Sequence, residues 1–270
     1  GKQCTIIWHV DDLKMSHVSD AVLDTIIGRL DEKYGKEAPL TVNRGLVHEY
    51  LGMTIDFSED GKVKFIMNDY VENLLDEIPE DMPGHAATPA ANHLFRINDK
   101  AEKLDKKDSE KYHHLTAKLL YLSKRARPDL QTAVAFFCKR VKQPDVDDWK
   151  KLGRCLRYLR GTKELILTLE SDGSGAIQWW IDASFAVHPD MKSHTGITMS
   201  LGKGSPFSCS TSQKLNTKSS TEAELVGVDD GMPLIIWTRN FLIAQGYKVK
   251  DNVVYQDNQS AILLERNGRA

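Results

Sequence analysis

The sequence predicts a fold of mixed α and β class, α+β or mixed α/β, in which a mostly helical middle part separates two parts that contain strands. Three observations predict it: apolar and alternating runs near the start, apolar residues at helical spacing through the middle, and strands combined with helices in the last hundred residues. Hydrophobic residues make up 41% of the 270 residues and charged residues 27%, a composition that can bury a core. No apolar run approaches the roughly 18 residues of a membrane span, so no membrane contact is expected.

The first part ends at about residue 82 and predicts the order strand, helix, hairpin, helix. Residues 4–10 form an apolar strand that ends at Asp11 and Asp12. Apolar residues then recur at helical spacing over residues 18–30. A β-hairpin around an acidic turn and a short amphipathic helix are predicted next, over residues 47–57 with 62–68 and over 69–78.

The middle part begins with a linker rich in Pro, Gly and Ala, residues 79–92. Three helices are predicted after it, over residues 117–129, 130–143 and 145–163. Although the formal net charge of the chain is -2, these helices are rich in Lys and Arg. A basic face of this kind suits a phosphate backbone, and a merely solvated basic surface is the alternative.

The last part follows a second linker, residues 170–175. Strands are predicted over residues 176–185, 194–202 and 206–213, with Gly202, Lys203 and Gly204 as a turn. A long helix is predicted from Thr221, then a strand over 252–257 and a helix over 258–267. We expect Pro233 to kink or break the long helix, because proline removes a backbone donor.

Two adjacent carboxylates, Asp11 and Asp12, stand on a turn between the first strand and the first helix. Two adjacent negative charges repel each other, which costs free energy unless a cation neutralises them. A divalent metal ion would do so, and phosphoryl transfer requires such an ion. An ordinary acidic turn or a helix cap is the alternative.

Four motifs in order give the chain a family resemblance: HVDDL, EYLGMTID, HHLTAKLLYLSKRARPDLQTAVAF and WKKLGRCLRYLRGTKELILTL. Together they resemble the Pol polyprotein of copia-type retrotransposons. The resemblance implies that residues 1–82 are the C-terminal part of a reverse transcriptase palm, 83–170 a helical thumb and connection, and 171–270 a ribonuclease H-like domain truncated at its C-terminus.

The resemblance also implies metal-binding and catalytic roles for Asp11 and Asp12 in RNA-directed DNA synthesis by the parent polyprotein. His9 stands where the family has Tyr or Phe. The upstream strand that carries the family's other polymerase aspartate is absent here, so we expect no polymerase activity from this fragment alone.

A second carboxylate set resembles that of the family's ribonuclease H, which cleaves RNA in RNA–DNA hybrids with two Mg²⁺ or Mn²⁺ ions. It carries over as the catalytic and metal-binding residues Asp182, Glu224 and Asp257. Residues on a helix advance about 100° each, so Glu224 should face the sheet with Val228, Met232 and Ile235, while Glu222 should face solvent and complete a capping box with Ser219. The family's further acidic ligand lies beyond the residues present.

Each of these carboxylates also has an ordinary alternative. Thr221 and Glu224 fit a capping-box pattern, Asp257 could cap the last helix, and Asp182 could be a polar strand end.

The resemblance implies an RNA–DNA hybrid, an RNA template with a DNA primer, and other Pol segments as partners. Hybrids are recognised by backbone shape. The nucleic-acid-binding residues that we predict are Lys118, Lys124, Arg125, Arg154 and Arg157. A catalytically inactive element remnant that only binds nucleic acid is the alternative function.

Some prominent residues are predicted to be structural. Arg127 should pair with Asp129 or with a helix end. The four tryptophans in periodic segments are predicted to be core residues: Trp149, Trp179, Trp180 and Trp237. We expect the protein in the cytoplasm, within an element particle, and in the nucleus, and not in the secretory route.

Overall fold

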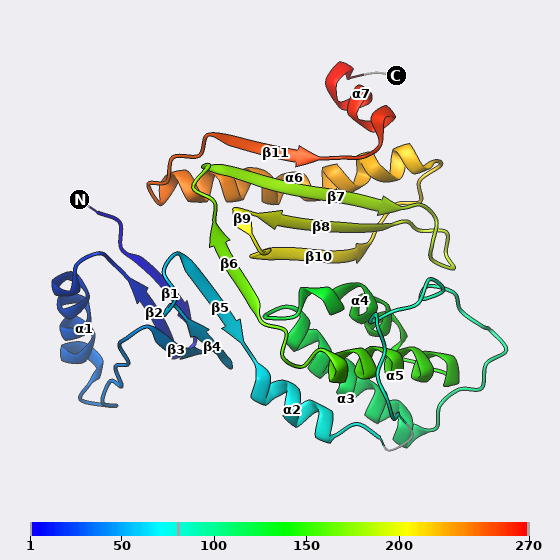
Figure 1. The fold of residues 1–270 in the computed structure, drawn as a ribbon, viewed down its shortest axis with the longest axis horizontal. Coiled ribbons are helices and arrows are strands. Elements are labelled where there is room, and N and C mark those ends of the chain that lie inside the picture. The colour runs from blue at the N-terminus through cyan, green and yellow to red at the C-terminus, as the bar shows by residue number, and fades with distance from the viewer. Residues whose placement is uncertain (1, 80–81, 269–270) are drawn as a thin grey trace.

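The computed structural model describes residues 2–79 and 82–268, and its strands form three sheets. Figure 1 shows an N-terminal group of strands with one helix, a group of helices, and a sheet backed by a long helix. Two residues of the predicted first linker, Glu80 and Asp81, lie outside the described residues. None of the described helices is both long and apolar enough to cross a membrane.

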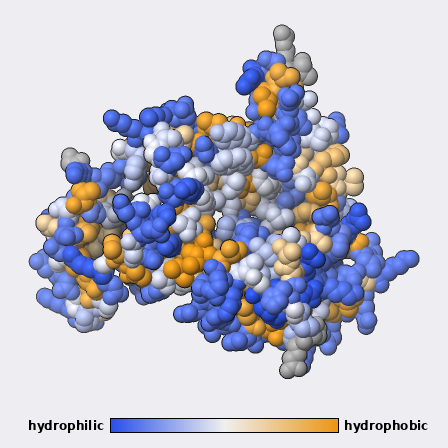
Figure 2. Space-filling view, in the orientation of Figure 1, coloured by the Kyte–Doolittle hydropathy of each residue, from blue (hydrophilic) through white to orange (hydrophobic). Residues whose placement is uncertain are grey.

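The first sheet is an isolated hairpin of β1 (Thr5–His9) and β2 (Asp12–Ser16). The strand β2 was not predicted, whereas α1 (Asp20–Tyr34) confirms the helix predicted over residues 18–30 and extends four residues beyond it. The register pairs His9 with Asp12 across a two-residue turn. No residue of α1 is buried, and Figure 2 shows hydrophobic patches over this part of the molecule.

A five-stranded sheet takes strands from all three predicted parts in the order β3-β4-β5-β6-β9. Its strands are β3 (Val47–Tyr50), β4 (Met53–Asp56), β5 (Lys62–Ile66), β6 (Leu167–Ser171) and β9 (Gly202–Lys203). The prediction of a single strand over 47–57 was wrong, because Leu51 and Gly52 have positive φ and turn the chain back. The strand β6 was also missed.

The larger hydrophobic core lies between this sheet and the helices α2 (Asn68–Asp76), α3 (Lys106–Ser123), α4 (Gln131–Arg140) and α5 (Val146–Gly161). The helices α2, α4 and α5 confirm the sequence prediction, whereas α3 begins eleven residues before the predicted start at residue 117 and ends six residues before the predicted end at 129. Arg127, 2% exposed, fixes the middle of the bundle. Its guanidinium pairs with Asp129 and also donates to the carbonyl of Thr162 at the end of α5, at 2.9 Å. Both structural partners considered for Arg127 are therefore present.

The third sheet has the order β10-β8-β7-β11 and lies against the 25-residue helix α6 (Ser220–Ala244). Its strands are β7 (Ala176–Ser184), β8 (His194–Ser200), β10 (Phe207–Ser212) and β11 (Asp251–Tyr255), and α7 (Gln259–Asn267) follows. β11 pairs with β7 in parallel, so the carboxyl ends of both strands lie at one edge.

Helix α6 approaches the sheet closely at two glycines. A Cβ on Gly231 would lie 3.1 Å from the Cδ1 atoms of Ile181 and Ile197, and one on Gly227 would lie 3.3 Å from Thr195. The expected break at Pro233 is absent, since α6 continues through it. Pro233 is exposed, so the carbonyl that it leaves without a helical donor can be hydrated.

Candidate active site

Asp182 lies within β7, two residues before the strand ends. Burial alternates along β7: Ile181 and Ala183 are buried against α6, and Asp182 is exposed. The alternation that makes β7 a central strand therefore projects this carboxylate away from the core and into solvent.

Glu224 lies in the second turn of α6 and is 5% exposed. Its Oε1 accepts a hydrogen bond of 3.2 Å from the backbone N–H of Ala183, the residue after Asp182. Burial, together with the nearby carboxylates of Asp182 and Asp257, raises the pKa of Glu224. A bound cation would offset this cost.

Glu222 occupies the other side of the helix, as predicted. Ser219 caps α6 by accepting from the N–H of Glu222, whereas the Glu222 carboxylate accepts from the N–H of Lys218 and not from Ser219, so the expected capping box is incomplete. Glu224 takes no part in capping, which removes that alternative. Met232 is exposed, contrary to prediction, and the small Gly231 faces the sheet instead.

Asp257 lies between β11 and α7 and is exposed. The cap of α7 is its neighbour Asn258, whose side chain accepts from the N–H of Ala261. The capping alternative for Asp257 is therefore wrong, and its carboxylate remains available for another partner.

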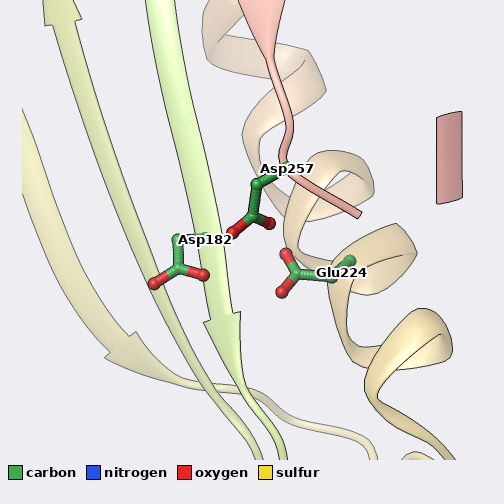
Figure 3. A group of neighbouring side chains, drawn as sticks. All are labelled: Asp182, Glu224 and Asp257. Atoms are coloured by element: carbon green, nitrogen blue, oxygen red, sulfur yellow. The ribbon is translucent and has the colours of Figure 1, made fainter. Parts of the chain in front are cut away.

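The three carboxylates are brought together. One oxygen each from Asp182, Glu224 and Asp257 lies within 4.8 Å of the other two, and these three are the group of potential metal ligands found among residues 2–79 and 82–268. Figure 3 shows them meeting from β7, α6 and the segment after β11. Oxygen donors at such spacing suit a hard divalent cation such as Mg²⁺ or Mn²⁺.

Gln256 belongs to the same cluster and was missed by the sequence analysis. Its Nε2 donates to Oε2 of Glu224 at 3.0 Å, so both oxygens of Glu224 are held by neighbours. The only sequence signal was its place beside Asp257, since no motif marks a glutamine that orients a carboxylate. A cavity of about 520 Å³ adjoins the cluster and is lined by Asp182 and Asp257 from one side and Thr132 of α4 from the other.

Comparison with known proteins finds relatives among retrotransposon polyproteins. The retrovirus-related Pol polyprotein from transposon TNT 1-94 of Nicotiana tabacum is 27% identical over 270 residues, 97% of this chain and 20% of that polyprotein. The polyprotein from transposon RE2 of Arabidopsis thaliana is 32% identical over 162 residues, 59% of this chain and 11% of its own length. The chain is a homologue of copia-type retrotransposon Pol polyproteins.

The share of each relative's own length that matches this chain varies widely. An uncharacterized mitochondrial protein of Arabidopsis thaliana is 25% identical over 220 residues, which cover 81% of the Pol homologue and 88% of that protein. No family model matches the chain.

In the Pol homologue, Asp11 and Asp12 lie far along the chain from the second carboxylate set, on the tip of the isolated β1–β2 hairpin. Asp11 is in the turn after Val10, which has a φ of 52°, and Asp12 begins β2. Both side chains are exposed. The described residues bring no third Cys, His, Asp or Glu to them.

The three predicted nucleic-acid-binding residues on α3 and just after it differ in the contacts that their side chains make. Lys118 is paired with Glu77, so it is partly neutralised. Lys124 is exposed, and the Arg125 guanidinium lies 3.6 Å from the ring centroid of Tyr121.

Arg154 and Arg157 lie elsewhere, on α5. They line a second cavity, of about 480 Å³, between α5 and the loop of residues 90–98. The predicted basic residues therefore fall into two groups. Lys118, Lys124 and Arg125 lie on α3 or just after it, and Arg154 and Arg157 line the cavity on α5.

Two of the four tryptophans are not core residues. Trp179 is fully buried and Trp149 packs against the larger core, as predicted. Trp180 is 40% exposed and stacks on Tyr255, while Trp237 is 59% exposed and stacks on Phe241. The prediction failed for these two because periodicity identifies an element but not which of its faces is covered.

Proposed function

We propose that residues 171–270 of this Pol homologue act as a ribonuclease H that binds two divalent metal ions and cleaves the RNA strand of an RNA–DNA hybrid. The convergence of Asp182, Glu224 and Asp257 carries the proposal. Three antiparallel strands, a helix that carries a carboxylate, and a parallel fourth strand that ends at another carboxylate support a ribonuclease H-like fold.

The residues present fit a metal centre. The donors are all carboxylate oxygens, and burial together with the charges of Asp182 and Asp257 raises the pKa of Glu224. Asp182 and Asp257 are exposed, so ions and a phosphodiester can reach them from solvent. Mg²⁺ or Mn²⁺ would be held by these three side chains.

Bound ions would supply a nucleophilic water at neutral pH and neutralise charge on the leaving oxygen. The chain's own contribution is positioning. Ala183 and Gln256 hold Glu224 in one orientation, and the close approach of α6 at Gly227 and Gly231 keeps that helix against β7. The adjoining cavity offers space for a strand of the substrate between the sheet and α4.

Cleavage of a labelled RNA–DNA hybrid with Mg²⁺ or Mn²⁺ tests the proposal. Wild-type chain should cleave the RNA strand, and Asp182→Asn should lose at least about a hundredfold in rate, since metal ligation is worth several kcal/mol. Asp229→Asn, an exposed carboxylate of α6, is the matched control and should retain activity. Equal cleavage by wild type and Asp182→Asn would reject the site.

For Asp11 and Asp12 we propose a role as polymerase metal ligands in the parent polyprotein. Their adjacent position on a hairpin tip supports this role, because both carboxylates are free to meet a ligand from another segment. The companion experiment is primer extension by the parent polyprotein. Asp11→Asn should abolish extension while leaving hybrid cleavage intact.

The second candidate function is nucleic-acid binding without catalysis. The basic cavity on α5 favours it, because that cavity involves none of the three carboxylates. A wild-type chain that binds hybrid but cleaves none at saturating Mg²⁺ and Mn²⁺ would establish binding alone.

A further inference from the structure

The cavity on α5 has an unusual charge. One stripe of the helix supplies Lys150, Lys151, Arg154 and Arg157 at helical spacing, and the facing loop supplies Arg96. Among the described residues that line the cavity, these five side chains are cationic and Asp147 supplies the one carboxylate.

That carboxylate is already engaged. Asp147 pairs with Lys150 at 3.2 Å and accepts a hydrogen bond of 3.2 Å from the Asn98 amide. These two hydrogen bonds lower the pKa of Asp147. It therefore cannot balance the charge of the other cations, and the cavity keeps a strong positive potential.

The loop is held in place over the helix. Leu94 is buried in the larger core, Lys151 Nζ donates to the carbonyl of Arg96 at 2.5 Å, and Arg154 Nη2 donates to Thr88 Oγ1 at 2.8 Å. The loop runs beside α5 in Figure 1. Because these contacts fix the walls, the cavity is organised before any ligand arrives.

Several arginine N–H donors that line the cavity on α5 have no partner within the described part of the chain. The Nε of Arg154 is buried with no hydrogen-bond partner. Among residues 2–79 and 82–268, the guanidinium groups of Arg96 and Arg157 also have no hydrogen-bond or ion-pair partner. Unmatched guanidinium groups that face one cavity are suited to an oxyanion with several acceptor oxygens, which they can bind through paired N–H groups.

We propose that the cavity between residues 90–98 and α5 is a phosphate-binding site, built on Arg96, Arg154 and Arg157, for a phosphate group carried by a nucleic-acid strand or present as the free ion. A volume of about 480 Å³ accommodates a phosphate with an attached sugar. Ala90, Ala91, Leu94 and Ile97 give the same cavity an apolar wall against which a sugar can pack. The site is independent of the carboxylate cluster and does not require it to be catalytic.

The test compares Arg96→Gln/Arg157→Gln with Arg29→Gln/Arg239→Gln, which removes two exposed arginines outside the cavity and matches the change in net charge. Both arms use metal-free buffer, so that the carboxylates hold no ion. The first arm measures the thermal midpoint in inorganic phosphate against chloride of equal ionic strength. The second measures fluorescence anisotropy of a labelled 12-nucleotide single-stranded DNA at low salt.

Wild type and the control should gain about 2–4 °C in phosphate, and the cavity variant should gain nothing. DNA affinity should fall about tenfold in the cavity variant, with a shallower salt dependence. Loss in the phosphate arm alone assigns the free ion as ligand, and loss in the DNA arm alone assigns the strand backbone. If the cavity variant matches the control in both arms, or wild type responds to neither ligand, the site is disproved.

The circular dichroism spectrum of each variant verifies its folding. If the double variant does not fold, Arg96→Gln alone gives the same comparison, because that side chain is exposed.

Discussion

The Nε2 of Gln256 donates a 3.0 Å hydrogen bond to Oε2 of Glu224, which links the end of β11 to the second turn of α6. The Ala183 N–H holds the other oxygen of the same carboxylate. The two residues that orient Glu224 are therefore chain neighbours of the other two carboxylates: Ala183 follows Asp182, and Gln256 precedes Asp257. The spacing of the cluster depends on this link as much as on the ligands themselves.

Replacing Gln256 with Ala should reduce hybrid cleavage by about 10-fold to 100-fold, as loss of a group that orients a metal ligand does. The hydrogen bond from Gln256 lowers the pKa of Glu224, so its loss should move the acidic limb of the pH–rate profile to higher pH. A fixed limb with reduced rate would show that Gln256 acts on something other than Glu224. The exposed Gln143→Ala is the control.

Glu222 and Glu224 form a matched pair for testing the site. Glu224→Gln should lower the cleavage rate at least about a hundredfold, because it removes a buried ligand charge. Glu222→Gln should change the rate less than about threefold, since its carboxylate lies on the other side of α6 and accepts from the Lys218 backbone. The reverse order of effects would place the catalytic carboxylate on the other face of α6.

His194 should make the protein sensitive to acid. It is buried beside His188, whose Nε2 lies 3.0 Å from its Nδ1, and beside Ser210 and the ring of Phe95. Burial, then the charges of His188 and Lys139, lower the pKa of His194 to about 4.

The lowered pKa of His194 makes the free energy of unfolding depend on pH, because the folded and unfolded chains bind protons differently. Above about pH 6.5 the His194 side chain is neutral in both states, and below that pH the unfolded chain binds a proton that the folded chain resists. The free energy of unfolding should therefore fall as the pH drops from about 6.5 to about 4, by on the order of 3 kcal/mol from this group. Urea titrations at several pH values measure it. His194→Gln should flatten that slope, whereas the exposed His113→Gln should not.

Arg127→Met should lower the free energy of unfolding by about 2–4 kcal/mol, because Asp129 and the carbonyl of Thr162 lose a buried, charged donor. Urea denaturation should show a lower midpoint with an unchanged slope. Lys142→Met, an exposed position two residues after α4, should change the midpoint little. Similar losses for both variants would mean that Arg127 contributes no specific interaction.

Pro233→Ala should raise the free energy of unfolding by about 1–3 kcal/mol, because it restores a backbone donor inside a continuous helix. Pro206→Ala should not stabilise, since Pro206 lies in the loop before β10, where proline limits the unfolded chain. Thermal unfolding of both variants measures the contrast. A destabilised Pro233→Ala would show that α6 needs the proline.

The sequence by itself determined most of the helices, the main strands of the third sheet and, through its family resemblance, the three candidate carboxylates. Helical spacing gave α2, α4, α5 and the last part of α3, and strand patterns gave β7, β8 and β10. The rotation of about 100° per residue placed Glu224 and not Glu222 toward the sheet. These features depend on neighbours in the chain, so a single sequence contains them.

Only the tertiary structure decided which surfaces meet. The pairing of β6 with β5 and β9, the exposure of Trp180, the hold of Gln256 on Glu224, and the basic cavity between α5 and a distant loop all join residues far apart in sequence. Hydrophobic periodicity reports which side of an element is apolar, but not which other element covers it. Those partners are selected by packing and hydrogen bonding across the whole fold.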